Sequence, residues 1–250
     1  MIVSHPEILL TIGMVGLYLY DSAMLLASNE ALLSPARKGK WRASFGADHF
    51  HIRGKEPFLP NPLLPHRPLY RFFWNTEGLV GPSQPWTPPS GNRYAILIPF
   101  IWAMLASLFV LIPLGLFSPL GDLAVAIGIL LFYANALMAL ALVWFNREGY
   151  GINGKRFAGL AFESLTCPPF ALNLVRHLSL GLRPRTDFLS VAGQYLSGIE
   201  YDATLAKAIF RIESELDWEG EDTPRGMALN AHRQYLIHEW HSSQACSEAP

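Results

Sequence analysis

One aspartate lies in the first apolar stretch of the chain. Asp21 sits within LYLYDSAMLLASNEALL, residues 17–33, and is the only charged residue between positions 8 and 29. A carboxyl group inside a bilayer costs about 2.5–3.5 kcal/mol on insertion scales, so it normally faces other helices and has a partner. Such a group serves either as a proton or ion carrier or as a hydrogen-bonded structural contact.

Two histidines are the only weak candidates for a metal site. His49 and His51 form the pattern HFH, and on a strand these side chains would share a face. A third ligand could come only from Asp48 or His66, so exposed strand histidines are the simpler interpretation. Three more histidines near the C-terminus lack the HExxH spacing of zinc proteases: His232, His238 and His241. We therefore expect no metal and no other cofactor.

Motifs for nucleophilic or nucleotide chemistry are missing from the sequence. It contains no GxSxG, Walker A or GxGxxG pattern. The glycine-rich GYGING, residues 149–154, follows an apolar stretch rather than a strand, so it does not indicate a phosphate-binding loop. The acidic run ESELDWEGED, residues 213–222, is typical of a solvated surface or of a site for a basic partner. These observations favour a protein that is not an enzyme.

Composition indicates the elements that hold these residues. The 250 residues are 51% hydrophobic and 16% charged, against roughly 25% charged in soluble domains. Residues 95–117 and 123–145 each form 23 uncharged positions, and about 20 suffice to cross a bilayer. Residues 8–29 are a third candidate, and because residues 1–7 hold no Lys or Arg, a signal peptide is disfavoured. The prediction is a mainly α polytopic membrane protein with three transmembrane helices.

The placement of positive charge predicts the orientation. All 19 Lys and Arg lie in residues 37–93 and 147–233, on the same side of the three predicted spans. Because positive loops stay in the cytoplasm, the N-terminus should be outside and the loop and C-terminal tail inside. In a bacterium the compartment would be the inner membrane. The net charge of −1 argues against a nucleic-acid partner.

Five segments follow from this topology. Residues 1–33 would hold the first span, 34–93 a proline-rich cytoplasmic strap, 94–146 a transmembrane hairpin, 147–185 amphipathic helices on the membrane surface, and 186–250 a helical cytoplasmic tail. The first half of the strap alternates in a way that predicts short strands or a hairpin. Its LYRFFW motif predicts anchors at headgroup level: Tyr70, Arg71, Phe72, Phe73 and Trp74.

Two helical features are expected beyond the spans. Residues 157–182 should form two helices broken at Pro168-Pro169, either on the inner membrane face or as a small cytosolic hairpin. In the tail, one helix should run over residues 223–241. Another should bury a stripe of apolar residues at helical spacing: Leu205, Ala208, Ile209, Ile212 and Leu216.

Matched depth predicts a partner for Asp21. It lies 13 residues into the first span and Asn135 lies 12 residues into the third, and both helices run the same way. The second span supplies small residues near this layer, Ala103, Ala106 and Ser107, which would let the helices approach closely. Asp21 and Asn135 are therefore predicted to form an interhelical polar contact.

Three functions remain open from the sequence. The first is a non-catalytic membrane subunit or scaffold, which docks other membrane protein subunits through its cytoplasmic loop and tail. The second is an oligomeric transport or proton-coupled component that uses Asp21 as the carrier. The third, with least support, is a membrane-bound metalloenzyme that uses the loop histidines.

Overall fold

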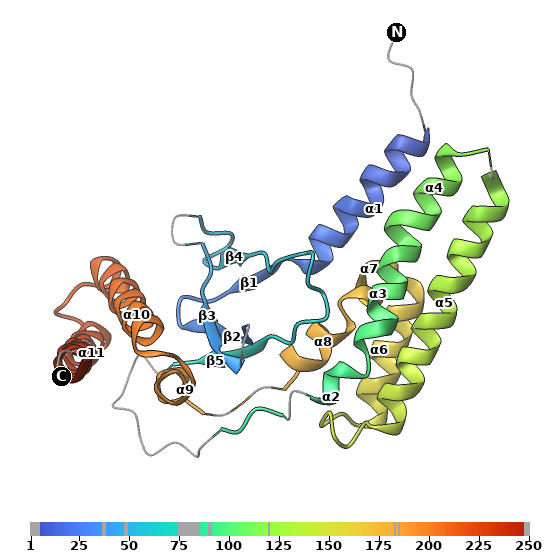
Figure 1. The fold of residues 1–250 in the computed structure, drawn as a ribbon. Helices are drawn as coiled ribbons and strands as arrows, with labels where there is room; N and C mark the ends of the chain where they lie inside the picture. Colours follow the sequence, from blue (N-terminus) through green and yellow to red (C-terminus); the bar gives the residue numbers. More distant parts are fainter. Residues whose placement is uncertain are drawn as a thin grey trace, which may run out of the picture. The chain divides into compact units, whose positions relative to one another are not determined.

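The computed structural model describes residues 6–36, 39–47, 50–74, 86–89, 92–119, 121–182, 184 and 186–247, with the backbone only for Asn92 and residues 242–247. The chain is mainly helical with a small β component, as predicted (Figure 1). It folds into two compact units: Met1–Met24, Leu59–Pro68 and Pro88–Leu182 form unit 1, and Leu25–Phe58, Leu69–Thr87 and Arg183–Pro250 form unit 2. Most of the predicted strap thus shares unit 2 with the tail, whereas residues 59–68 and 88–93 of the strap belong to unit 1.

A helical hairpin forms most of unit 1. Its first arm consists of α2 (Asn92–Ala95), α3 (Ile98–Ala106), a π-helical turn (Ser107–Leu111) and α4 (Ile112–Phe117), and its second arm is α5 (Gly121–Phe145). The arms come closest at two glycines. A Cβ atom on Gly115 would lie 2.8 Å from the Val125 nitrogen, and one on Gly128 would lie 2.8 Å from Ile112 Cγ1. Only glycine permits this approach, because any side chain would force the helices apart.

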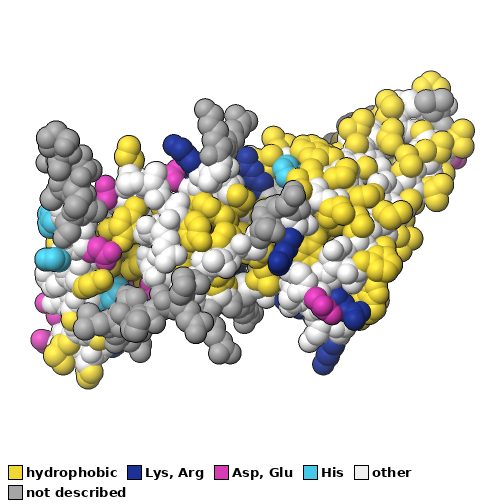
Figure 2. All heavy atoms as spheres, turned by 60° about the horizontal axis from the view of Figure 1, so that its bottom comes forward, with side chains coloured by type: hydrophobic (Ala, Val, Ile, Leu, Met, Phe, Trp, Pro, Cys, Tyr) yellow, Lys and Arg dark blue, Asp and Glu magenta, His cyan; other side chains and the backbone are white. Residues whose placement is uncertain are grey.

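Both arms of the hairpin are long and apolar enough to cross a membrane. The two segments are Arg93–Phe117 and Gly121–Phe145, and only 33% and 28% of their most apolar windows are buried within the protein. A core helix of a soluble protein would be mostly buried. Figure 2 shows hydrophobic side chains over most of the visible face of this helical part. Large exposed apolar surfaces of this kind mark contact with a membrane or another protein.

The first helix is shorter than the predicted span over residues 8–29. Helix α1 runs over Pro6–Ser22, 17 residues or about 25 Å, and the chain then enters strand β1, Met24–Leu26. Among the described residues, the long apolar helices therefore number two rather than the three expected. Asp21 consequently lies in the last turn of α1 and not near the middle of a span. The depth comparison with Asn135 assumed a longer helix.

The break at the proline pair is confirmed. Helix α6 (Gly154–Thr166) ends before Cys167, and Pro168 starts α7 (Pro168–Leu172), which is followed by α8 (Leu174–Leu180). The prediction of surface helices is wrong for the second half, because nearly every side chain of α7 and α8 is buried within unit 1. Helix α7 packs against α1, α3 and α6, so it belongs to the core of this unit.

Unit 2 contains two small sheets. Strand β2 (Glu30–Pro35) lies between β3 (Trp41–Ser44) and β5 (Tyr70–Phe73) in a small antiparallel sheet. Strand β1 pairs with β4 (Glu56–Phe58). The central strand buries Ala31, Leu32 and Leu33 completely, because both of its faces are covered.

The LYRFFW segment corrects the prediction of membrane anchors. Tyr70, Phe72 and Trp74 are at most 1% exposed, and their rings pack against other aromatic side chains of unit 2. Arg71 donates to the Leu25 carbonyl and lies 3.8 Å from Glu30. Only Phe73 is exposed. Aromatic residues on a strand are equally suited to a core and to an interface, and here the core holds three of the four.

Three helices complete unit 2. They are α9 (Phe188–Tyr195), α10 (Gly198–Glu219) and α11 (Pro224–Ser247), and α10 packs against α11 (Figure 1). The predicted apolar stripe of α10 is buried as expected. Helix α10 ends at Gly220, whose φ of 82° suits glycine, and Pro224 opens α11. Glu219 precedes the turn between α10 and α11, and Arg225 follows it.

Candidate functional site

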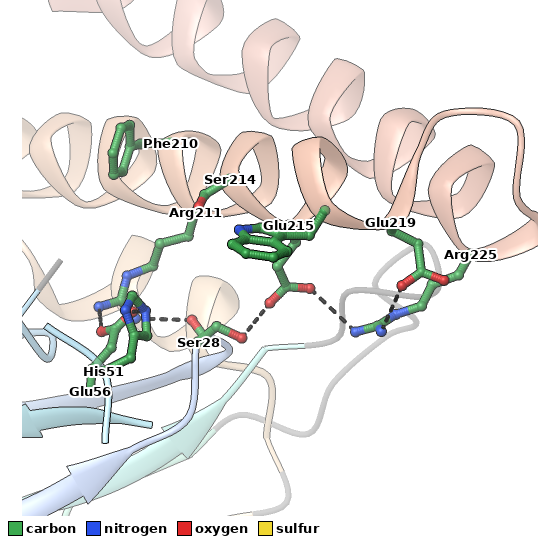
Figure 3. A pocket seen from close by; sticks show the side chains of 10 residues that line it. Ser28, His51, Glu56, Phe210, Arg211, Ser214, Glu215, Glu219 and Arg225 are labelled. Atoms are coloured by element: carbon green, nitrogen blue, oxygen red, sulfur yellow. Dashed lines mark hydrogen bonds and ion pairs between the residues drawn. The ribbon is translucent and has the colours of Figure 1, made fainter. Parts of the chain in front are cut away.

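A pocket lined by charged and aromatic side chains lies wholly within unit 2. It has a volume of about 420 Å³ and is open to solvent on one side. Its lining comes from the β1–β2 turn, from the segment around β4, from the outer half of α10 and from the start of α11 (Figure 3). The lining residues are Ser28, His51, Glu56, Phe210, Arg211, Ser214, Glu215, Trp218, Glu219 and Arg225.

A buried arginine forms the floor of this pocket. The Arg211 side chain is 5% exposed and forms an ion pair with the equally buried carboxylate of Glu56. Its guanidinium also donates to the Ser28 carbonyl at 2.9 Å and to the Gly46 carbonyl at 3.4 Å. The Cζ atom of the guanidinium lies 5.0 Å from the centre of the Phe45 ring. A buried charge is tolerated only when it is paired and hydrogen-bonded, and Arg211 satisfies both conditions.

The ion pair at the base of the pocket requires the backbone at Gly46 to lie close to Glu56. A Cβ atom on Gly46 would lie 2.3 Å from Glu56 Cβ, so only glycine fits beside the glutamate. The sequence gives one signal for Arg211: it follows Ala208 by three positions, so it falls on the buried stripe of its helix. An arginine on an apolar stripe indicates a buried ion pair, but the partner, Glu56, is far away in the sequence.

The outer part of the pocket is a chain of charged contacts. The Ser28 hydroxyl donates to one oxygen of Glu215, whose other oxygen lies 3.4 Å from Arg225. Arg225 also lies 3.3 Å from Glu219. Figure 3 shows these side chains in a row along the pocket wall. Such partly exposed pairs contribute little to stability, typically about 0–1 kcal/mol, so they are available to exchange partners.

Two aromatic side chains stand at the rim of the pocket. Trp218 is 91% exposed and Phe210 is 49% exposed. Trp218 lies inside the acidic run, next to Asp217 and Glu219. With Arg211 already paired to Glu56, the outer pocket holds two carboxylates, Glu215 and Glu219, against the single guanidinium of Arg225. Carboxylates beside an exposed indole are suited to a cationic group, which both can contact.

The metal candidates are only partly described. His51 lines the pocket with Nε2 3.8 Å from Glu56, whereas His49 lies outside the described residues. Within the ranges that the structure describes, His, Cys, Asp and Glu form no group of three able to hold a metal ion. Of the C-terminal histidines, His232 is buried between α10 and α11.

Asp21 belongs to a second polar cluster, inside unit 1. Its Oδ2 atom accepts a hydrogen bond from Asn173 Nδ2 at 2.8 Å and lies 3.4 Å from His177 Nε2. The Asn173 amide also donates to the Ser22 hydroxyl at 3.0 Å. His177 stacks on Phe170 with ring centres 3.8 Å apart. The cluster thereby joins the end of α1 to α7 and α8.

Arg176 completes this second cluster. It is 3% exposed and donates to Asn173 Oδ1 at 2.9 Å, to the Asn61 carbonyl at 2.6 Å and to the Leu64 carbonyl at 3.2 Å. Burial lowers the pKa of its guanidinium, while the nearby Tyr18 and Asp21 act in the opposite direction. A carboxylate at a helix C-terminus opposes the helix dipole, and the positive charge of Arg176 offsets that repulsion.

The predicted pairing of Asp21 with Asn135 is thus corrected to Asn173 and His177. Asn135 instead donates to the Leu131 carbonyl of its own helix at 2.7 Å. The predicted small-residue surface is also only partly buried: Ser107 is enclosed, whereas Ala106 is exposed. Ser107 donates to the Ala103 carbonyl within its own helix. The glycines at positions 115 and 128 take the packing role that the alanines were expected to have.

Comparisons with protein-family models, curated proteins and solved structures find no match to this chain. The interpretation of both clusters therefore rests on their own geometry.

Proposed function

We propose that this protein is a non-catalytic membrane-bound docking subunit. In this proposal unit 1 lies in the lipid bilayer and unit 2 lies in the cytoplasm, where its charged pocket holds a basic segment of a partner protein. The observation that carries the proposal is the combination of two long apolar helices, mostly unburied, with an open acidic and aromatic pocket in the other unit.

The pocket chemistry supports binding rather than catalysis. The two buried charged residues, Arg211 and Glu56, form an ion pair, and Arg211 also donates to a backbone carbonyl. Neither is therefore placed as a reactive group. The outer carboxylates are held by a hydroxyl and by Arg225, contacts that an incoming lysine or arginine can replace. An indole that is 91% exposed next to them offers an apolar and cation-binding face. The occupant is therefore a peptide segment in which a basic residue stands beside apolar ones.

The orientation in the membrane follows from charge. In unit 1, Arg93, Arg147 and Lys155 lie at one end of the hairpin, and Asp122 lies at the other. We propose that the basic end faces the cytoplasm. Helix α1, which at 17 residues has the minimum length for a span, would be the third crossing, with the N-terminus outside.

A proton-coupled role for Asp21 is the second candidate. The observation in its favour is the pair Asp21–His177, whose side chains are 18% and 26% exposed and therefore accessible to water. Against it, Asp21 also accepts a hydrogen bond from Asn173, which itself accepts from the buried Arg176, as expected for a structural contact.

Photo-crosslinking tests the docking proposal. A photoreactive phenylalanine analogue at Trp218 should give one discrete adduct in intact membranes, and its peptide should carry Lys or Arg beside apolar residues. Glu215→Gln combined with Glu219→Gln should reduce the yield roughly tenfold, the effect of about 1.4 kcal/mol of binding free energy. The same probe at Ile199, equally exposed on α10 but remote from the pocket lining, is the control.

Two results would contradict this proposal. One is an equal adduct yield from positions 218 and 199, which would mean random collisions. The other is an adduct at position 218 whose yield is unchanged in the Gln variants, which would mean that the carboxylates do not bind the partner.

A further inference from the structure

A loop at the basic end of the hairpin of unit 1 is closely tied together. After α5, the Ile152 nitrogen donates to the Arg147 carbonyl at 3.1 Å and the Gly151 nitrogen to the Glu148 carbonyl at 3.1 Å. The Asn146 amide donates back to the Leu142 carbonyl at 2.9 Å. Gly151 has a φ of 63°, which suits glycine. The loop over residues 146–152 thus has a defined conformation before any ligand arrives.

The other arm of the hairpin is fixed to this loop. The Tyr150 hydroxyl donates to the Arg93 carbonyl at 2.7 Å, and the Arg93 guanidinium donates to the Gly149 carbonyl at 2.5 Å. The rings of Tyr94 and Tyr150 pack with centres 5.5 Å apart. Arg93 is therefore held beside the loop with further N–H groups available, since a guanidinium has five.

Two adjoining hollows lie at this junction. One, of about 410 Å³, is lined by residues 144–149, and the other, of about 200 Å³, by Arg93, Ile96, Asn146, Gly149 and Tyr150. They share Asn146 and Gly149, so a single ligand can enter both. In Figure 2, Lys and Arg side chains gather at one end of the helical part, beside an acidic side chain.

The Arg147 side chain lies over the Trp144 ring and keeps its positive charge available for a ligand. Its guanidinium lies 4.3 Å from the centre of the Trp144 ring, and among the described residues it forms no hydrogen bond or ion pair. Lys155 is exposed nearby on α6. This end of the hairpin carries three cationic side chains, Arg93, Arg147 and Lys155. The neighbouring carboxylate is Glu148, so the net charge here is positive.

Exposed apolar side chains border the same site. Trp144, Phe145 and Ile96 are 41%, 81% and 47% exposed. A free phosphate ion would gain nothing from these surfaces, whereas the acyl chains of a lipid would bury them. Tryptophan at this level is also typical of the boundary between lipid and water.

We propose that Arg93, Arg147 and the 146–152 loop bind the phosphate of an anionic phospholipid in the cytoplasmic leaflet. This inference rests on the membrane placement proposed above for unit 1. The two guanidinium groups hold the phosphate oxygens, Asn146 contacts the glycerol or headgroup oxygens, and the acyl chains lie along Trp144 and Phe145. Lipid binding at this site would hold this end of the hairpin in the cytoplasmic leaflet. It would therefore stabilise the same orientation that the positive charges favour.

Lipid retention in native mass spectrometry tests this site. The full chain is placed in nanodiscs of equal phosphatidylglycerol and phosphatidylcholine and released, and the bound lipids are counted. Wild type should retain phosphatidylglycerol in preference, and Arg93→Gln with Arg147→Gln should reduce that preference by at least about tenfold, or about 1.4 kcal/mol. Arg42→Gln, at an exposed position of β3 in unit 2, should leave this preference unchanged, and Glu148→Gln should increase it. Inorganic phosphate at millimolar concentration should not displace the lipid.

The outcomes separate this inference from the membrane proposal. If the protein leaves the membrane on alkaline carbonate extraction, the membrane placement fails and this site fails with it. If the protein remains in the membrane but wild type retains both lipids equally, or the double Gln variant retains phosphatidylglycerol like wild type, the site alone is overturned. Displacement by inorganic phosphate would show an anion site without lipid recognition, which also overturns it.

Discussion

Among the residues that the structure describes, each unit buries one arginine, and the two arginines have different surroundings. Arg176 in unit 1 is 3% exposed, and it donates to the Asn173 amide oxygen and to two backbone carbonyls. Arg211 in unit 2 is 4% exposed, and its strongest partner is the carboxylate of Glu56. Arg176 is enclosed by its unit, whereas Arg211 forms the floor of an open pocket. The same residue type thus ties a helix end in one unit and forms the floor of a charged pocket in the other.

The comparison shows how burial decides the role of a charged cluster. Around Asp21 the hydrogen bonds join groups of unit 1 to one another: the Asn173 amide donates to Asp21 and to Ser22. Around Arg211 the inner contacts are matched, but the outer carboxylates and Trp218 face solvent. We therefore propose a docking role for the pocket around Arg211 and a structural role for the cluster around Asp21.

The largest effect is expected from Arg211→Met. Removal of one partner of a buried ion pair costs about 3–5 kcal/mol because Glu56 would remain buried without its cation. Unfolding by guanidinium chloride, followed by tryptophan fluorescence, should show this loss, since Trp74 lies 6.0 Å from the guanidinium. Arg225→Met is the matched control on the pocket wall and should cost at most about 1 kcal/mol.

A second variant separates the charge from the packing. Arg211→Met combined with Glu56→Leu should recover much of the lost stability, because an apolar pair can replace a buried ion pair. A double variant as unstable as Arg211→Met alone would show that the carbonyl contacts to Ser28 and Gly46, and not the charge pair, hold the floor.

In unit 1, Arg176→Met should cost roughly 1.5–3 kcal/mol. That is the range for hydrogen bonds to a charged group, and the change would leave the carbonyls of Asn61 and Leu64 without their donor. Limited proteolysis of the detergent-solubilised protein should show earlier cleavage in residues 59–68. Wild-type protection of this segment in the variant would mean that other contacts hold it.

The two substitutions of Asp21 should differ in size. Asp21→Asn keeps an oxygen that can accept from Asn173, so the stability should fall by about 1 kcal/mol or less. Asp21→Leu removes the acceptor and should cost about 1–3 kcal/mol. Thermal unfolding in detergent measures both. Normal folding of Asp21→Asn together with loss of a measured proton flux would favour the carrier hypothesis instead.

The smallest effect concerns alkaline pH in unit 2. Burial and the hydrogen bond from Tyr201 to Glu239, 2.6 Å long, raise the pKa of the Tyr201 phenol above its usual value of 10.0. The folded state then binds this proton more tightly than the unfolded state, so its stabilising effect is complete below pH 10 and is lost as pH rises further. Tyr201→Phe should flatten this decline. A spectroscopic titration in which Tyr201 ionises near pH 10 would contradict the shift.

Local patterns in the sequence predict the local structure well. The uncharged runs predict both arms of the hairpin, the proline pair predicts the break before α7, and the 3.6-residue spacing from Leu205 to Leu216 predicts the buried face of α10. Each of these depends on residues close together in the chain, where spacing and composition act directly.

The errors come from contacts between distant segments. The residues Met24–Leu26 are as apolar as a helix interior, and only their pairing with β4 makes them a strand. Once α1 ends at Ser22, the depth that was matched to Asn135 no longer applies. Asn173 follows Asp21 by 152 residues and Arg211 follows Glu56 by 155, so neither pairing leaves a local pattern. The aromatic residues of LYRFFW likewise give no indication of whether protein or lipid covers them.

The central claim is that unit 1 crosses the membrane and unit 2 lies in the cytoplasm, and cysteine labelling tests it most directly. In a chain with Cys167→Ser and Cys246→Ser, single cysteines replace Ser118, in the turn between α4 and α5, or the exposed Ser214 on α10. A membrane-impermeant maleimide applied to intact cells should label position 118 and should reach position 214 only after lysis. Labelling of position 214 in intact cells would contradict the account.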